Sequence, residues 1–101
     1  MVEIKKEEEL QEFLSANPVA LVDFWAPWCG PCRTLSPIFE GLAKSTPTAG
    51  FAKINCDEAR ELAIKYGVRS IPTVIVFKDG EVSSSLTGVK SVEEYTEAIG
   101  Q

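Results

Sequence analysis

Apolar positions along the chain repeat at helical spacing in some stretches and run almost without interruption in others. Near the N-terminus, Leu10, Phe13 and Leu14 recur at helical spacing among charged residues, which predicts a first helix over about residues 6–16. The following segment, Val19–Trp25, is apolar almost throughout, as is typical of a strand covered on both faces. The first quarter of the chain therefore predicts a helix followed by a central strand.

A second helix is predicted after this strand from a stripe of apolar residues at positions i, i+3, i+4 and i+7: Leu35, Ile38, Phe39 and Leu42. It should run to about Lys44 and bend at Pro37, because a proline inside a helix removes a backbone hydrogen bond. Phe51–Cys56 predicts another strand, and Asp57 is placed to cap a third helix that ends at Gly67. The inner face of that helix should consist of its apolar residues Ala59, Leu62, Ala63 and Tyr66.

The last third of the chain predicts a hairpin and a final helix. Thr73–Phe77 is a β-branched run that ends in an aromatic residue, and Asp79-Gly80 is a strong turn signal before a weaker strand over about residues 81–87. These two strands should pair antiparallel. Ser91 and Glu94 have the spacing of a capping box and predict the start of the final helix. Its inward-facing residues should be Val92, Tyr95 and Ile99.

The order of these elements, with a short edge strand over Val2–Ile4, is that of an α/β fold. We expect a central mixed sheet of four to five strands with about four helices on both faces. The 101 residues suit a single domain over residues 1–101. No apolar run approaches the roughly 20 residues of a membrane span. The first residues lack the features of a secretory signal, so we expect a cytoplasmic location.

The charge and the cysteine content restrict the possible functions. The chain has 10 basic and 15 acidic residues, a formal net charge of -5, and no basic cluster, which argues against nucleic-acid binding. Three cysteines are too few for a disulfide framework, which leaves catalysis or metal binding for a cysteine pair. A structural zinc site needs four Cys or His ligands, and the chain has no His, so it cannot close such a site alone. We therefore expect redox chemistry and no metal.

The segment Trp28-Cys29-Gly30-Pro31-Cys32 holds two thiols one helical turn apart, directly after the apolar strand. This spacing puts the two Cα atoms about 5 to 6 Å apart, which a disulfide can bridge. The start of the next helix should favour the thiolate form of Cys29, whereas Cys32 lies one turn further in and should be less exposed. Cys29 would attack a disulfide in a partner protein, and Cys32 would then attack Cys29 to release the reduced partner. A static disulfide is the alternative, although so small a loop adds little stability.

Asp23 interrupts the apolar strand with a carboxylate, which is costly to bury without a partner. Burial should raise its pKa, and its place just before the cysteine turn suits an acid/base group for Cys32. The alternative is a buried ion pair with Lys53, whose strand also carries a charge among apolar residues. The two interpretations can hold together.

Several segments together resemble the thioredoxin family, at that family's spacings: Val22-Asp23-Phe24-Trp25-Ala26, Trp28-Cys29-Gly30-Pro31-Cys32, Pro37, Lys53, Ile71-Pro72-Thr73, Lys78-Asp79-Gly80-Glu81 and Gly88. The resemblance covers about residues 4–99. It implies the thioredoxin fold, with Cys29 as nucleophile, Cys32 as resolving thiol, and Asp23 and Lys53 as a buried pair beside them.

The resemblance also implies a shallow substrate groove, lined by Trp28, Gly30, Pro31, Ser70, Ile71, Pro72, Thr73 and Gly88. The local sequence favours a trans Ile71-Pro72 bond, whereas the resemblance implies a cis bond with Pro72 facing the sulfurs. Ser70 departs from the family pattern, because bacterial members often have Gly there, and this difference bears on client preference.

By this resemblance the protein is a general protein disulfide reductase and electron carrier, re-reduced by a thioredoxin reductase that draws on NADPH or ferredoxin. It needs no bound cofactor, its other partners are disulfide-containing client proteins, and nothing demands more than a monomer. Gly30-Pro31 between the cysteines, unlike the Gly-His of isomerases or the Pro-Tyr of many glutaredoxins, favours reduction. Two alternatives are a binding module that holds a partner near Trp28 and Pro72 without turnover, and an oxidase or isomerase.

Cys56 stands outside this mechanism. It falls in phase with Ala52 and Ile54 on its predicted strand, which favours a small apolar-like core residue. A regulatory or dimer-forming thiol is the alternative.

Overall fold

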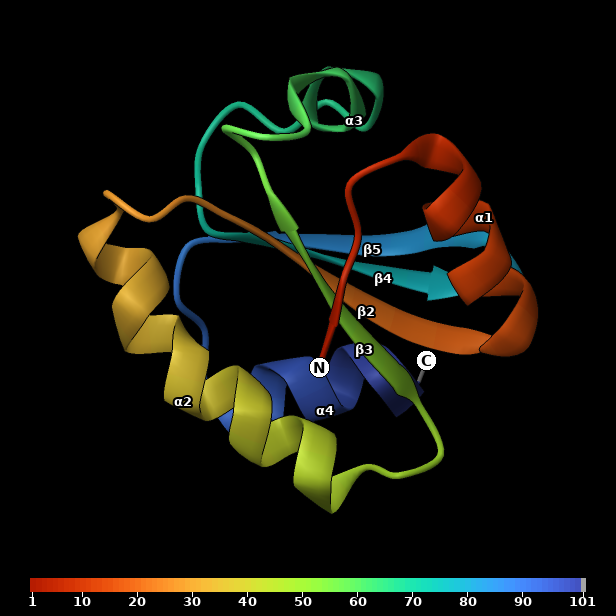
Figure 1. Cartoon of the computed structure of the whole chain (residues 1–101). Helices are drawn as coiled ribbons and strands as arrows, with labels where there is room; N and C mark the ends of the chain where they lie inside the picture. The colour runs from red at the N-terminus through yellow and green to blue at the C-terminus, as the bar shows by residue number, and fades with distance from the viewer. Residues whose placement is uncertain (101) are drawn as a thin grey trace.

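The computed structural model describes residues 1–100 as a five-stranded mixed sheet with helices on both faces (Figure 1). Its elements in chain order are β1 (Val2–Glu3), α1 (Glu7–Ala16), β2 (Val19–Trp25), α2 (Gly30–Ser45), β3 (Gly50–Asn55), α3 (Arg60–Lys65), β4 (Thr73–Lys78), β5 (Glu81–Thr87) and α4 (Val92–Gly100). The predicted α/β class is confirmed. Within residues 1–100, no helix has the length and apolar character to cross a bilayer.

The sheet has the strand order β1-β3-β2-β4-β5. Strands β1, β3 and β2 run parallel, while β4 is antiparallel to β2 and β5 is antiparallel to β4. The predicted central strand is therefore β2, which pairs on both sides. The predicted hairpin is also present, and its turn residues Asp79 (φ 52°) and Gly80 (φ 83°) adopt the left-handed conformation that a tight hairpin needs.

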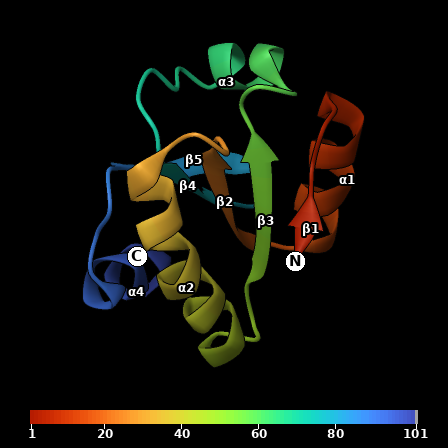
Figure 2. The same ribbon diagram turned by 60° about the vertical axis from the view of Figure 1, so that its left-hand side comes forward.

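Two apolar cores lie on opposite faces of the sheet, and the turned view in Figure 2 shows the helices on either side of the strands. On β2, Ala20, Val22 and Phe24 belong to the core that α1 and α3 cover, whereas Leu21 belongs to the core that α2 and α4 cover. Side chains alternate along a strand, so Asp23 shares the face of Leu21. The fold thus brings this carboxylate to the side of the sheet where the cysteine helix α2 packs.

The start of α3 differs from the sequence expectation. Asp57 does not cap this helix, which begins at Arg60 after the N-cap residue Ala59 and has no side-chain cap. The Asp57 carboxylate instead accepts a hydrogen bond from Trp28, 29 positions earlier in the chain. A long-range partner therefore displaced the local capping interaction that the sequence pattern favoured.

The final helix begins with the predicted capping box. The Glu94 N–H donates to Ser91 Oγ at 3.1 Å, and the Ser91 N–H donates to Glu94 Oε1 at 3.1 Å. Tyr95 is buried as predicted, but the prediction that Val92 faces inward is wrong, since its side chain is 47% exposed. Ala98 takes the buried position, because it lies about one turn after Tyr95 on the same side of α4.

Candidate active site

Cys29 and Cys32 form a disulfide where β2 leads into α2. Their Cα atoms are 5.3 Å apart, within the range expected from the sequence. Cys29 is the N-cap residue of α2, and the Cys32 N–H donates a hydrogen bond to Cys29 Sγ at 3.2 Å. Negative charge on the Cys29 sulfur would therefore be stabilised by a backbone donor and by the positive end of the helix dipole.

The two cysteines are equally buried, each with 4% of its surface exposed. The expectation that Cys32 is the less exposed of the two is therefore wrong. It rested on helix position alone, whereas the Ile71 carbonyl oxygen approaches Cys29 Sγ to 3.7 Å and Ile71 packs against the small cluster that contains both cysteines. Position at the helix start, rather than exposure, is what distinguishes Cys29 from Cys32.

The loop before β4 places its backbone beside the disulfide. The Ile71-Pro72 bond is cis, so the trans form favoured by the local sequence is wrong and the form implied by the family resemblance is present. The local preference amounts to only about 0.5–1 kcal/mol, which tertiary contacts easily override. One such contact is the hydrogen bond from the Gly88 N–H to the Pro72 carbonyl oxygen at 2.8 Å.

Of the eight residues expected to receive substrate, four are exposed and two, Ile71 and Gly88, are half-buried. We call these six the disulfide face: Trp28, Gly30, Pro31, Ser70, Ile71 and Gly88. Trp28 is its largest exposed apolar side chain, 68% exposed, and its indole N–H donates to Asp57 at 3.0 Å. Pro72 and Thr73 are buried instead. The Thr73 hydroxyl donates to the Ser70 carbonyl oxygen at 2.6 Å, so Thr73 supports the disulfide face from below.

Asp23 is the one buried carboxylate described in residues 1–100, with 1% of its surface exposed. Burial raises its pKa to about 7; the positive charge of Lys53 opposes this shift, and Glu3 adds a smaller increase. Its Oδ1 atom has no hydrogen-bond partner among the described residues. These properties fit a carboxyl group that can exchange a proton near neutral pH.

Lys53 does not form the direct ion pair with Asp23 that the sequence suggested. The two residues are opposite each other in the register of β2 and β3, but the only ion pair within residues 1–100 joins Glu7 and Lys65. The Lys53 ammonium lies 4.5 Å from the centre of the Trp25 ring, in a cation–π contact. Lys53 therefore acts on Asp23 at longer range, which is why burial dominates the pKa of the carboxyl group.

A small hollow of about 90 Å³ lies beside Cys32, lined by Trp25, Ala26, Pro27, Cys32, Arg33, Ser36 and Lys53. Arg33 and Ser36 are not among the residues that the sequence pattern indicates for this region. The Arg33 guanidinium donates to the Pro27 carbonyl oxygen at 2.8 Å and so braces the loop before Cys29. Ser36 could have been found from its spacing, since it lies four residues, or one helical turn, after Cys32.

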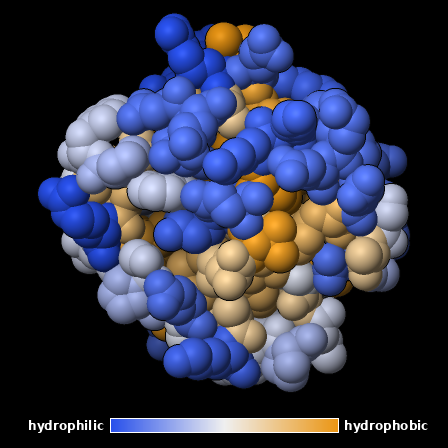
Figure 3. All heavy atoms as spheres, viewed as in Figure 1, coloured by the Kyte–Doolittle hydropathy of each residue, from blue (hydrophilic) through white to orange (hydrophobic). Residues whose placement is uncertain are grey.

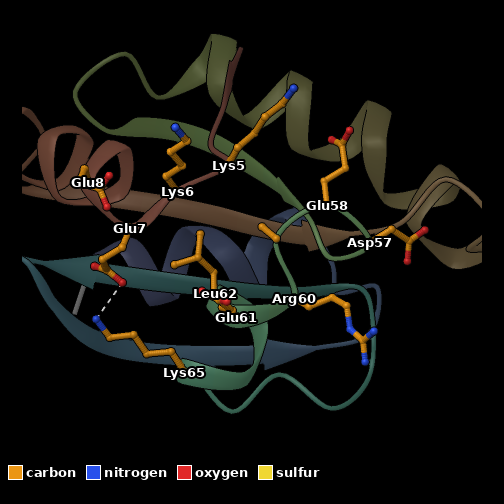
Figure 4. Close-up of a pocket in the computed structure, with 11 residues that line it drawn as sticks. Lys5, Lys6, Glu7, Glu8, Asp57, Glu58, Arg60, Glu61, Leu62 and Lys65 are labelled. Atoms are coloured by element: carbon orange, nitrogen blue, oxygen red, sulfur yellow. Dashed lines mark hydrogen bonds and ion pairs between the residues drawn. The ribbon is translucent and has the colours of Figure 1, made fainter.

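A larger hollow of about 680 Å³ lies between the start of α1 and α3 (Figure 4). Its lining is mostly charged, and an ion pair of 2.8 Å between Lys65 and Glu7 closes one side. It shares Asp57 with the surroundings of Trp28 but includes neither cysteine of the disulfide. Redox chemistry therefore belongs to the disulfide face.

Cys56 is the free thiol and lies just beyond the end of β3. It is half-buried, packs against the core under α1 and α3, and donates its backbone N–H to the Trp25 carbonyl oxygen at 2.8 Å. Burial first, and then the charges of Asp57 and Asp23, raise the pKa of this thiol. These surroundings favour the interpretation of Cys56 as a core residue, because a reactive cysteine needs a lowered pKa.

The sequence matches the family described as Thioredoxin over residues 1–101. It is 46% identical over 101 residues to a thioredoxin of Chlamydia pneumoniae, with 100% of this chain and 98% of the relative covered. It is 41% identical over 99 residues to a thioredoxin of Mycoplasmoides gallisepticum, with 98% and 99% covered. Among solved structures, a mutant thioredoxin from Halobacterium salinarum is similar, with a TM-score of 0.92, 41% identity, and coverage of 97% of this chain and 86% of that one.

Proposed function

The chain belongs to the thioredoxin family and carries out thiol–disulfide exchange, and we propose that Cys29 and Cys32 have different roles in this reaction. Cys29 is the attacking thiol, and Cys32 is the resolving thiol. The observation that carries this assignment is the place of Cys29 at the N-cap of α2, where the Cys32 N–H donates to its sulfur. Among the sulfurs of the pair, Cys29 Sγ has the position that stabilises a thiolate.

Two exchange steps follow from this assignment. The Cys29 thiolate attacks one sulfur of a client disulfide, and the client's other sulfur leaves with the bonding electron pair and takes up a proton. Cys32 then loses its proton and attacks Cys29 Sγ, so that the remaining client sulfur leaves as a thiolate and the Cys29–Cys32 disulfide forms. Two electrons pass to the client, which is reduced while this chain is oxidised.

Asp23 is the proposed proton acceptor for Cys32 in the second step. It is buried on the side of the sheet that α2 covers, and its pKa near 7 lets it take up and release a proton without an extreme change of pH. Lys53 tunes this group electrostatically, because its charge opposes the effect of burial. Both residues therefore support the chemistry without touching the client.

The disulfide face is the proposed docking site for client proteins. Trp28 offers an exposed apolar ring next to Cys29, and Ile71 presents its backbone carbonyl beside the sulfur. The partners we propose are disulfide-containing clients and a thioredoxin reductase that returns the two electrons. We propose a cytoplasmic location, since a reductant of disulfides needs a reducing compartment to be regenerated. We also propose that the protein is a monomer.

Variants of Cys29 and Cys32 test which of them is the attacking thiol and which is the resolving thiol. With a peptide that holds one disulfide, the Cys32→Ser variant should accumulate a mixed disulfide through Cys29, because the resolving thiol is missing. The Cys29→Ser variant should not form this adduct, and Cys56→Ser, which leaves the active pair intact, serves as the matched control. Mass spectrometry after acid quenching identifies the adducts. Sustained peptide reduction by Cys29→Ser would contradict the assignment.

A further inference from the structure

Three residues of α2 lie in one row that leads away from the disulfide: Cys32, Ser36 and Glu40. They are four residues apart, so they follow one another along the same side of the helix. Cys32 is buried, Ser36 is half-buried and Glu40 is exposed. The row therefore runs from the resolving thiol to the surface.

These side chains are also connected through space. Ser36 and Cys32 both line the hollow of about 90 Å³, which is large enough to hold water. The Ser36 hydroxyl donates a hydrogen bond to Glu40 Oε2 at 3.2 Å. A hydroxyl group accepts one hydrogen bond while it donates another, so Ser36 can pass a proton from the hollow to the Glu40 carboxylate.

The hollow has polar groups on its other walls that suit water. The Trp25 indole N–H is buried without a partner among the described residues, and the Lys53 ammonium group stands over the same ring. Lys53 also lines a second hollow, to which Glu40 contributes. Ser36, Lys53 and Glu40 thus connect the hollow beside Cys32 with the surface along α2.

We propose that Ser36 and Glu40 form the route by which protons move between the Cys32 region and solvent. This inference rests on the proposed function, because it concerns the proton that Cys32 loses in the second exchange step. The Cys32 S–H bond breaks as the sulfur attacks Cys29 Sγ, the proton passes through Asp23 and the hollow, and Ser36 hands a proton to Glu40. When the disulfide is reduced again, a proton returns to Cys32 by the reverse path.

The route gives each residue a definite role. Ser36 and Glu40 are proton-transfer residues that do not touch the client, so the first exchange step does not depend on them. Several charged or titratable groups lie near the route, on α2 itself and on neighbouring elements: Arg33 and Lys44 on α2, Asp23 on β2, Lys53 on β3, Glu3 on β1 and Tyr95 on α4. A variant that removes only the Ser36 hydroxyl leaves all of these charged and titratable groups in place, so it tests the hydroxyl alone.

Single-turnover kinetics can separate the two steps. Reduced protein is mixed with increasing concentrations of a symmetrical peptide disulfide, and the products are quenched with acid and weighed by mass spectrometry. The concentration-dependent rate at low peptide reports attack by Cys29, and the plateau rate at high peptide reports attack by Cys32. Ser36→Ala should lower the plateau rate by about tenfold near pH 7, less than the roughly 100-fold typical of losing a direct acid/base group.

Two further readouts distinguish proton transfer from a structural effect. The deficit of Ser36→Ala should shrink as pH rises, because hydroxide then removes the proton directly. Ser36→Thr should keep the plateau rate, since it retains the hydroxyl, and Glu40→Gln should lower it. Thr34→Ala is the matched control, because it removes an exposed hydroxyl elsewhere on the same helix.

A plateau rate in Ser36→Ala that equals that of the unmodified protein at every pH would overturn the proposed route. An equal deficit in Ser36→Thr would also overturn it, because the hydroxyl would then be irrelevant. Failure of the proposed function is a separate result, since the unmodified protein would then show no plateau and Cys29→Ser would still react.

Discussion

At the scale of single residues, Asp23 shows how the fold changes the chemistry of a side chain. Its pKa is raised from 3.8 to about 7 because the carboxyl group is buried, so the folded chain holds a proton that the unfolded chain releases. Below about pH 4 both states are protonated and the shift costs nothing. Between about pH 4 and 7 the free energy of unfolding falls as pH rises. Above about pH 7 the raised pKa lowers the free energy of unfolding by its full amount, about 4 kcal/mol.

Replacing Asp23 with Ala removes this pH-dependent cost. The difference in unfolding free energy between Asp23→Ala and the unmodified protein should shift in favour of the variant by up to about 4 kcal/mol from pH 4 to pH 8. Urea unfolding at several pH values measures it. Because the cavity left by the substitution costs the same at every pH, a difference that stays constant over this range would contradict the raised pKa.

The same variant should also slow the second exchange step while leaving attack by Cys29 little changed. The physical reason is that Asp23 is the proposed acceptor for the Cys32 proton, whereas Cys29 reacts as a thiolate at the helix start. Single-turnover reduction of a peptide disulfide measures both steps. If Asp23→Ala matched the unmodified protein in both, Asp23 would have no place in the mechanism.

At the scale of elements, the start of α4 depends on the side chains of its capping box. Ser91 accepts a hydrogen bond from the Glu94 N–H, one of the backbone donors that a helix leaves free at its first turn. This helix carries Tyr95 and Ala98 into the core beneath the sheet. Its first turn also follows the Gly88 segment of the disulfide face, so the cap holds both a core helix and a border of the site.

Ser91→Ala should lower the free energy of unfolding by about 1 kcal/mol, the usual loss when a cap side chain is removed. Ser85→Ala is the matched control, because Ser85 is exposed on β5 and makes none of the described side-chain hydrogen bonds. Denaturant unfolding of the two variants at one pH measures the contrast. If the two variants had equal free energies of unfolding, hydrogen bonds to water would replace the Ser91 cap without loss of stability, and the prediction would be wrong.

At the scale of the whole molecule, the surface favours a single chain in solution. The face drawn in Figure 3 is hydrophilic over its upper part, and apolar residues show among polar ones from its centre downward. The large exposed apolar side chains of the described residues are spread over the chain: Met1 and Val2 at the N-terminus, Trp28 before α2, Ile64 on α3, Val82 on β5, and Val89 and Val92 around the start of α4. Single exposed apolar residues of this kind do not build an interface, and a net charge of -5 makes copies repel.

The protein should therefore sediment as a species of 11.0 kDa at all accessible concentrations. Sedimentation equilibrium of the oxidised and the reduced forms measures this mass. A mass that rises toward twice that value with concentration would contradict the monomer. Repeating the measurement with Trp28→Ala would then show whether the disulfide face forms the contact.

Much of the architecture could be predicted because it depends on local patterns. The bounds of β2 agree with the apolar run Val19–Trp25, and the hairpin follows from the conformational freedom of Asp79-Gly80. In contrast, the local sequence predicts that Asp57 caps a helix and that Val92 faces the core, and both predictions are wrong. Local patterns leave such residues several partners, and packing over the whole chain selects among them.

The sequence by itself determined that two thiols stand one turn apart at the start of a helix after an apolar strand, because spacing and helix geometry are local properties. Only the tertiary structure decided what surrounds them. It brought the Ile71 carbonyl to Cys29 across 42 positions of the chain and buried Asp23 on the face of the sheet that α2 and α4 cover. It also placed Lys53 over Trp25 rather than against Asp23. Burial, pKa and contacts of these groups depend on distances between strands and helices, which no single segment contains.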